Sequence, residues 1–287
     1  MNQSVVVGID GSAQSETAAR WAAEEARRSG RSLRMVHVAA AGGGVLPPAG
    51  EPVERLPEPV AEIRDRIAAA LPELAISCVR VTGSPSYALA AAGERAGLLV
   101  LGSRGLGVVV GTLVGSVGLR TASHIRCPVV LVRDGADDGT ADTAGEVVVG
   151  VQGDRPCDAV LAFAFDQAAR RGAALRAVEA WRPPVRRYVT QAQVEQPAIR
   201  ESLAADRLVH LQDALGRWRE KYPEVPTHAE VVGVGAADAL QAASRKASLV
   251  VLGRRAPGHP TAAPRLGVVA HAVLHHAHSP VAVVPHD

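Results

Sequence analysis

Short apolar runs alternate with helical patterns along the chain. In the first half, the apolar runs fall at 4–9, 33–39, 75–81, 98–102 and 129–132, and each is continuous or nearly so. Strands buried on both faces of a sheet have this pattern. The clearest helix between them has Ser12 or Ser15 as its cap and Gly30 as its stop, with an apolar stripe of alanines between. The alternation predicts β-α-β units and a parallel sheet.

The same pattern occurs twice. Residues 4–11, SVVVGIDG, recur as residues 146–153, EVVVGVQG, and the Cys-Pro-Val near 128 recurs as Ser-Pro-Val near 280. The repeat predicts two tandem doubly wound α/β domains, each a five-stranded, mostly parallel sheet with helices on both faces. We expect domain 1 at 1–134, a polar linker at 135–145 and domain 2 at 146–287.

A glycine pattern follows the fourth strand of the first repeat. Gly102-x-x-Gly105 is followed, after nine residues, by Gly115-Ser116. Glycines let backbone N–H groups approach a phosphate, and the N-terminus of a helix favours negative charge. Arg104 adds positive charge, and Ser116 adds a hydroxyl donor. The spacing therefore predicts a phosphate cradle at the carboxyl edge of the sheet.

VGIDGS after the first strand, G-x-x-G-x9-GS after the fourth and a Cys-Pro-Val-Val-Leu-Val final strand together resemble the universal stress protein family, in its tandem ATP-binding form. The resemblance covers essentially the whole chain. It implies an adenine nucleotide at the strand edge, with Asp10 near the ribose and base. It also implies apolar contacts to the adenine from Ile9, Val38 and Leu101, and contacts to the ribose and phosphates from Gly102, Arg104, Gly105, Gly115, Ser116 and Val117.

The second repeat departs from this pattern. Gln152 replaces Asp10, Ala256 replaces Gly105, and Val268 replaces Ser116. These changes remove a charged acceptor and a hydroxyl donor, and prolines at 257, 260 and 264 remove N–H groups. We therefore expect domain 1 to bind ATP, and domain 2 to bind it weakly or not at all. Arg254 and Arg255 leave open the alternative that domain 2 still holds an anion.

The resemblance implies a regulatory stress-response protein whose ligand is ATP, ADP or AMP, with Mg²⁺ as an optional companion. No catalytic residue is assigned, since P-loop, kinase and G-x-S-x-G motifs are absent from the sequence. A slow ATPase or phosphotransferase at the same site is the alternative, and a ligand-free module is a third. The final strands, 129–132 and 281–284, are apolar edge strands, which favour pairing with another strand. The family resemblance implies a homodimer. The protein partner that would respond to the regulatory state is unidentified.

Composition narrows the classes of partner, location and site that remain open. A net charge of +2 and 3% aromatic residues argue against nucleic acid as a partner. The longest uncharged run is too short to cross a membrane, and the first residues lack a secretion pattern, so we expect a cytoplasmic protein. Histidines at 271, 275, 276 and 278 have spacings that could bind a metal, although we favour a structural role. Three cysteines without a C-x-x-C pair favour packing over a metal site or disulfides.

Overall fold

The computed structural model describes residues 3–39, 56–103, 115–133, 145–152, 155–181, 197–255 and 266–286, with the side chains of 197–200 excluded. Several predicted features lie outside these residues. They are Arg104, Gly105, Ala256, the three prolines of the second loop and the linker up to residue 144.

Each repeat forms a five-stranded parallel sheet, as predicted. The first repeat contains β1 (Val5–Ile9), β2 (Leu33–Ala39), β3 (Ile76–Thr82), β4 (Leu98–Gly102) and β5 (Val129–Val132). The second contains β6 (Glu146–Gly150), β7 (Leu175–Ala180), β8 (Thr227–Val232), β9 (Ala247–Arg255) and β10 (Val281–His286). The strand orders are β3-β2-β1-β4-β5 and β8-β7-β6-β9-β10, so both repeats are doubly wound in the same way.

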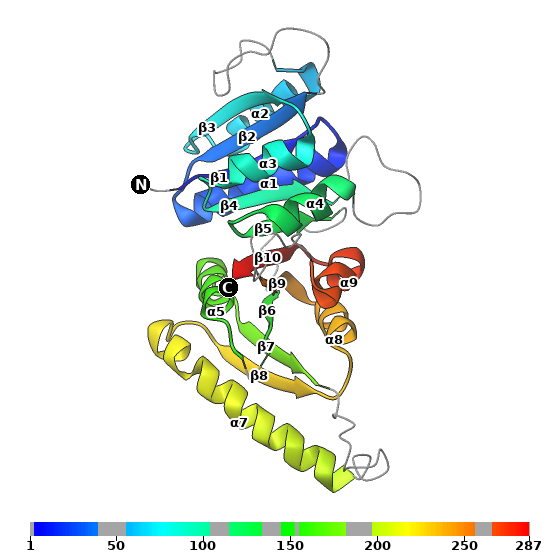
Figure 1. Ribbon diagram of the computed structural model, residues 1–287. Coiled ribbons are helices and arrows are strands. Elements are labelled where there is room, and N and C mark those ends of the chain that lie inside the picture. Colours follow the sequence, from blue (N-terminus) through cyan, green and yellow to red (C-terminus); the bar gives the residue numbers. More distant parts are fainter. Residues whose placement is uncertain are drawn as a thin grey trace.

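The two sheets join into one sheet of ten strands (Figure 1). Strand β5 pairs antiparallel with β10, and Val130 lies opposite Ala282, its counterpart in the repeat. Equivalent residues facing each other in this way indicate a two-fold relation between the repeats. The predicted pairing of the final strands is confirmed within one chain. A homodimer of whole chains would use another surface, and it stays a prediction.

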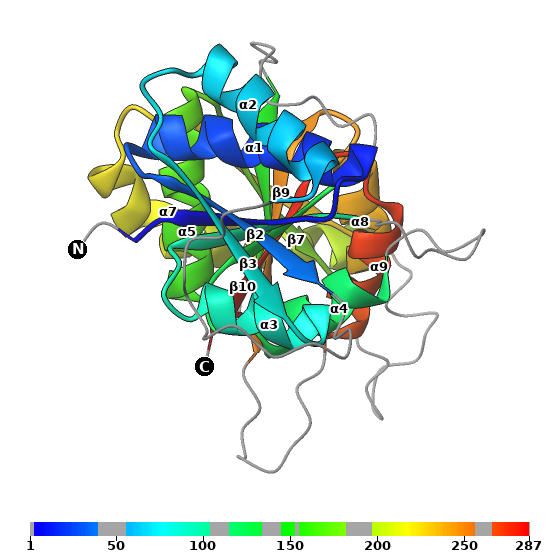
Figure 2. The same cartoon turned by 90° about the horizontal axis from the view of Figure 1, so that it is seen from above.

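Helices cover both faces of the sheet (Figure 2). One face carries α1 (Ala13–Ser29), α2 (Glu58–Ala70), α5 (Asp158–Arg171) and α7 (Pro197–Lys221). The other carries α3 (Pro85–Gly93), α4 (Ser116–His124), α8 (Ala236–Ala243) and α9 (Val268–His276). On each face, the buried apolar residues of the two repeats contact one another and form a single cluster. Each face therefore has one continuous hydrophobic core that extends across both repeats.

Local sequence explains where α1 begins and ends. The hydroxyl oxygen of Ser12 accepts a hydrogen bond from the backbone N–H of Ser15 at 3.2 Å, so Ser12 rather than Ser15 is the N-cap. Gly30 ends the helix with a φ of 62°, a left-handed conformation that glycine adopts without steric cost. The alanine stripe is fully buried and lets α1 pack closely on the sheet.

A buried polar cluster joins the repeats where α1 meets α5. Glu25 and Gln167 are both 1% exposed, and the amide of Gln167 donates to a carboxylate oxygen of Glu25 at 2.7 Å. The guanidinium of Arg171 donates to the other oxygen at 2.9 Å and lies over the ring of Trp21. Glu25 and Gln167 are repeat counterparts, so the contact lies on the two-fold relation. The second repeat supplies an amide where a symmetric pair would place a second carboxylate.

Candidate functional site

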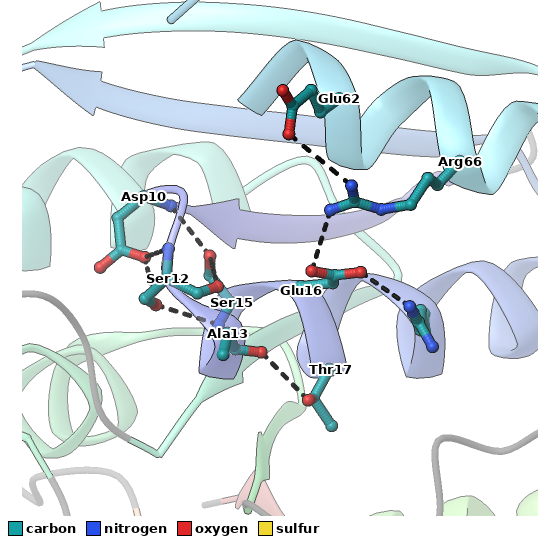
Figure 3. Close-up of polar contacts among 9 residues, drawn as sticks. Asp10, Ser12, Ala13, Ser15, Glu16, Thr17, Glu62 and Arg66 are labelled. Atoms are coloured by element: carbon teal, nitrogen blue, oxygen red, sulfur yellow. Dashed lines mark hydrogen bonds and ion pairs between the residues drawn. The ribbon is translucent and has the colours of Figure 1, made fainter. Parts of the chain in front are cut away.

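The turn after β1 is fixed by a compact set of hydrogen bonds (Figure 3). A carboxylate oxygen of Asp10 accepts from the backbone N–H of Ser12 at 3.0 Å and from its hydroxyl at 2.6 Å. The backbone N–H of Asp10 donates to the Ser15 hydroxyl oxygen at 3.3 Å. Gly11 has a φ of 86°, which an L side chain rarely adopts. The turn therefore holds Asp10 at the carboxyl end of β1.

The predicted apolar residues come together at the same edge. Strands β2, β1 and β4 are neighbours and run parallel, so Val38, Ile9 and Leu101 all lie at carboxyl ends. Ile9 and Leu101 are buried, and Val38 is half-buried. Gly8 lies against Leu101, because a Cβ at Gly8 would be 2.7 Å from a Leu101 methyl carbon. The structure thus places an apolar surface beside the Asp10 turn.

The structure describes the first and the last residues of the segment that is predicted to bind phosphate. Gly102 ends β4, and the backbone N–H of Gly115 donates to the carbonyl of Ser103 at 2.7 Å. This bond brings the start of α4 to the end of β4. Ser116 and Val117 are exposed in the first turn of α4, and no side chain of the described residues caps this helix. Its first N–H groups are thus available to an anion, as at other helix N-termini.

Eight of the ten predicted site residues therefore occupy one sheet edge or the helix start beside it. Arg104 and Gly105 lie outside the described residues. His37, next to Val38, shares a hydrogen bond at 3.0 Å between its Nδ1 and the carbonyl oxygen of Ile9. This bond ties β2 to β1 at the site, so His37 has a packing role there.

The second repeat has a cavity at the equivalent edge. Its volume is about 690 Å³, and its lining includes Val151, Gln152, Leu240 and Leu252. The apolar wall is thus retained although Gln152 replaces the aspartate. Arg254, the buried counterpart of Ser103, donates to the carbonyl of Ile125 in the first repeat. Burial lowers the pKa of this guanidinium from its ordinary value.

Sequence reasoning missed the residues that make this cavity distinctive. Glu179 is buried, and one of its oxygens accepts from Arg207 at 2.5 Å. The guanidinium of Arg207 lies 5.3 Å from the ring centre of Trp181. The alignment of Glu179 with His37 was visible in the sequence, but the partner Arg207 was not. It comes from α7, a helix of 25 residues, whereas the helix at the same place in the first repeat, α2, has only 13.

Comparison with known proteins identifies the family. The universal stress protein family model matches residues 1–133 and again 144–285. The chain belongs to the universal stress protein family. Universal stress protein Rv2005c of Mycobacterium tuberculosis is 32% identical, with 97% of this chain and 96% of that protein covered. A universal stress protein of Mycolicibacterium smegmatis is 30% identical, with 98% and 96% covered. A crystal structure of a universal stress protein from Archaeoglobus fulgidus covers 99% of this chain and 96% of its own, with 16% identity and a TM-score of 0.64, and shares the fold.

Of the four clustered histidines of this universal stress protein, His271, His275 and His276 lie on α9, and His278 follows it. The rings of His271 and His275 are 4.6 Å apart, and Arg133 donates to the carbonyl of His275 at 2.8 Å. Burial lowers the pKa of His275, and the neighbouring His271, His276 and Arg133 lower it further. Across the residues that the structure describes, no three His, Cys, Asp or Glu side chains gather as a metal site would require.

The environment of the cysteines agrees with the packing role predicted for them. Cys78, Cys127 and Cys157 are free thiols, and burial raises the pKa of Cys127 to about 12. A thiol with that pKa is a packing group rather than a nucleophile at neutral pH. Among the described helices, none has the length and apolar character that a membrane crossing needs.

Proposed function

We propose that the first repeat binds an adenine nucleotide, with ATP as its working ligand, and that the chain is a regulatory stress-response protein. The observation that carries the proposal is the convergence of three chemistries at one sheet edge. Asp10 supplies an acceptor, Ile9 and Leu101 supply apolar surface, and the start of α4 supplies N–H donors beside Ser116. These match the ribose hydroxyls, the base and the phosphates of a nucleotide.

Adenine is proposed from the family resemblance, because the described residues at this edge present no side chain that reads one base over another. Asp10 is assigned to the ribose, and the phosphates are assigned to Gly102, Gly115, Ser116 and Val117. Arg104 and Gly105 belong to the proposed phosphate contacts as well. A Mg²⁺ ion would be held mainly by phosphate oxygens, since hard cations of this kind often keep few protein ligands.

A matched pair of substitutions tests the site. Ser116 and its counterpart Val268 both occupy the first position of a nine-residue helix, and both are exposed. An aspartate at either position stabilises the helix N-terminus, so neither variant should unfold the protein. In the first repeat, however, the new carboxylate would face the nucleotide phosphates and repel them.

Isothermal titration of ATP measures the difference. We expect Ser116→Asp to weaken ATP binding at least tenfold, which corresponds to about 1.4 kcal/mol. Val268→Asp should leave the affinity and the stoichiometry of one nucleotide per chain unchanged. Weaker binding in Val268→Asp with an unaffected Ser116→Asp would assign ATP to the second repeat and overturn the proposal.

The alternative of slow ATP turnover has a separate test. Hydrolysis needs a group that positions the attacking water near the γ-phosphate. Steady-state ADP release that disappears in Ser116→Asp would establish an ATPase at this site. We propose a binding role instead, and we expect ADP release no faster than in buffer from protein that is saturated with ATP.

A further inference from the structure

The cavity of the second repeat lies at the carboxyl ends of β6, β7 and β9. Its volume of about 690 Å³ is within the range of small-molecule sites in proteins. Val151 and Leu252 form part of its wall, at the positions where the first repeat has Ile9 and Leu101. The second repeat has therefore kept an apolar, ligand-sized space while its polar groups have changed.

Glu179, in the lining of this cavity, has an unsatisfied carboxylate oxygen. The residue is only 3% exposed, and its Oε1 accepts from Arg207. Its Oε2 is buried and has no hydrogen-bond partner among the described residues. A buried carboxylate oxygen without a partner is costly, and a ligand N–H donor would satisfy it. Arg207 also lies over Trp181, so the carboxylate is held in place by a packed guanidinium.

The other side of the cavity carries positive charge. Strands β7 and β9 flank β6, so the backbones at Glu179 and Arg254 are separated by two strand spacings, roughly 10 Å. The Nε of Arg254 is buried without a partner in the described part of the chain. Arg155 and Arg255 also line the cavity, and both are exposed to solvent. With Glu179 paired to Arg207, these arginines give the cavity a net positive charge.

We propose that this cavity binds an anionic ligand whose opposite end is a ring with N–H donors, and that among nucleotides it prefers guanine to adenine. Glu179 receives the ring, and the arginines face the anionic group. A carboxylate only accepts hydrogen bonds. The N1–H and N2–H groups of guanine are two adjacent donors, whereas adenine presents an acceptor at N1 beside its amine. The proposal concerns the second repeat and does not rest on ATP binding by the first.

Trp181 provides a local readout, because it lines the cavity, whereas Trp21 lies on α1 and Trp218 on α7, outside the cavity lining. We would titrate the full chain with GMP and with AMP and follow tryptophan fluorescence. We expect GMP to change the emission with an affinity about tenfold higher than that of AMP, a ratio typical of one well-placed hydrogen-bonded contact. The change should vanish in Trp181→Phe.

Glu179→Gln tests the role of the carboxylate. The glutamine oxygen can still accept from Arg207, but the amide nitrogen is a donor and opposes the guanine N–H groups. An amide can pair with the adenine edge, as glutamine does in DNA recognition. We therefore expect the GMP preference to fall about tenfold and to shift toward AMP. A purely structural Glu179 would weaken both ligands alike.

His37→Gln is the matched control, because His37 is the counterpart of Glu179 in the first repeat. It should leave the Trp181 signal and the GMP preference unchanged. Equal or tighter AMP binding by the unmodified protein, no emission change with either nucleotide up to millimolar concentration, or a preference unaltered by Glu179→Gln would each overturn the proposal. Failure of ATP binding in the first repeat would appear instead in the Ser116→Asp titration.

Discussion

The buried cluster between the repeats makes a quantitative prediction about how the two halves hold together. Replacing Gln167 by glutamate would put a second carboxylate at hydrogen-bond distance from Glu25, where the amide nitrogen is now 2.7 Å from a Glu25 oxygen. Both positions are 1% exposed, so water would not screen the repulsion. Arg171 is mostly buried, and it already pairs with Glu25 at 2.9 Å. Arg171 also donates to the Gln167 side-chain oxygen at 2.6 Å, and Arg170 lies 3.7 Å from Glu25, so these arginines would offset only part of the repulsion between two carboxylates.

The variant loses the amide donor to Glu25 and places two buried carboxylates on one shared guanidinium, and we expect Gln167→Glu to lower the free energy of unfolding by about 1–3 kcal/mol at pH 7. The added carboxyl would have a raised pKa in the folded state, so the folded state would bind its proton more tightly than the unfolded state does. The destabilisation should therefore shrink as the pH falls toward the unfolded value of about 4.3.

A double-mutant cycle separates the interaction between Glu25 and Gln167 from a general loss of stability. Glu25→Gln alone removes the partner of the buried Arg171, whose pKa burial already lowers, and we expect a similar loss of stability. Combining Glu25→Gln with Gln167→Glu restores one carboxylate, one amide and one guanidinium. The double variant should recover to within about 1 kcal/mol of the unmodified protein, because strongly coupled neighbours are not additive.

Urea unfolding followed by circular dichroism at pH 7 and pH 4.5 measures these differences. The control is Glu16→Gln, which removes exposed ion pairs to Arg20 and Arg66 and should cost at most about 1 kcal/mol. Additive losses in the double variant, or a Gln167→Glu effect no larger than that of the control, would refute the account of this interface.

Two further predictions concern titratable groups. Cys127, with a pKa raised to about 12, should resist a thiol reagent at pH 8 in the folded protein while the half-buried Cys157 reacts; equal labelling rates would contradict this. The pKa of His275 is lowered, so the folded state binds fewer protons than the unfolded state, and stability should fall as the pH drops below about 6.5. His275→Asn should flatten this part of the stability profile, and an unchanged slope would rule out His275 as its source.

Much of the fold could be predicted because the sequence carries local signals for it. The continuous apolar runs place all five strands of the first repeat to within about one residue, and Ser12 and Gly30 mark the limits of α1. These features depend on neighbours in the sequence. The repeat offset then predicted the same architecture for the second half, and the apolar character of the two final strands indicated the pairing of β5 with β10.

The long-range polar contacts could not be predicted in the same way. Glu25 reads as one polar position on an alanine-rich helix, yet it is buried because α5 of the other repeat covers it. Glu179 aligns with His37, but its burial depends on Arg207 and the long helix α7. Contacts of this kind depend on which surfaces meet in space, and a single sequence gives no local signal for that.

Native mass spectrometry of the protein saturated with ATP tests the central claim most directly, when it is combined with chromatography of the nucleotide released on denaturation. We expect one adenine nucleotide for each chain, lost in Ser116→Asp and retained in Val268→Asp. Two adenine nucleotides per chain would contradict the separation of roles between the repeats. No bound adenine nucleotide at millimolar ATP and Mg²⁺ would contradict the proposed function itself.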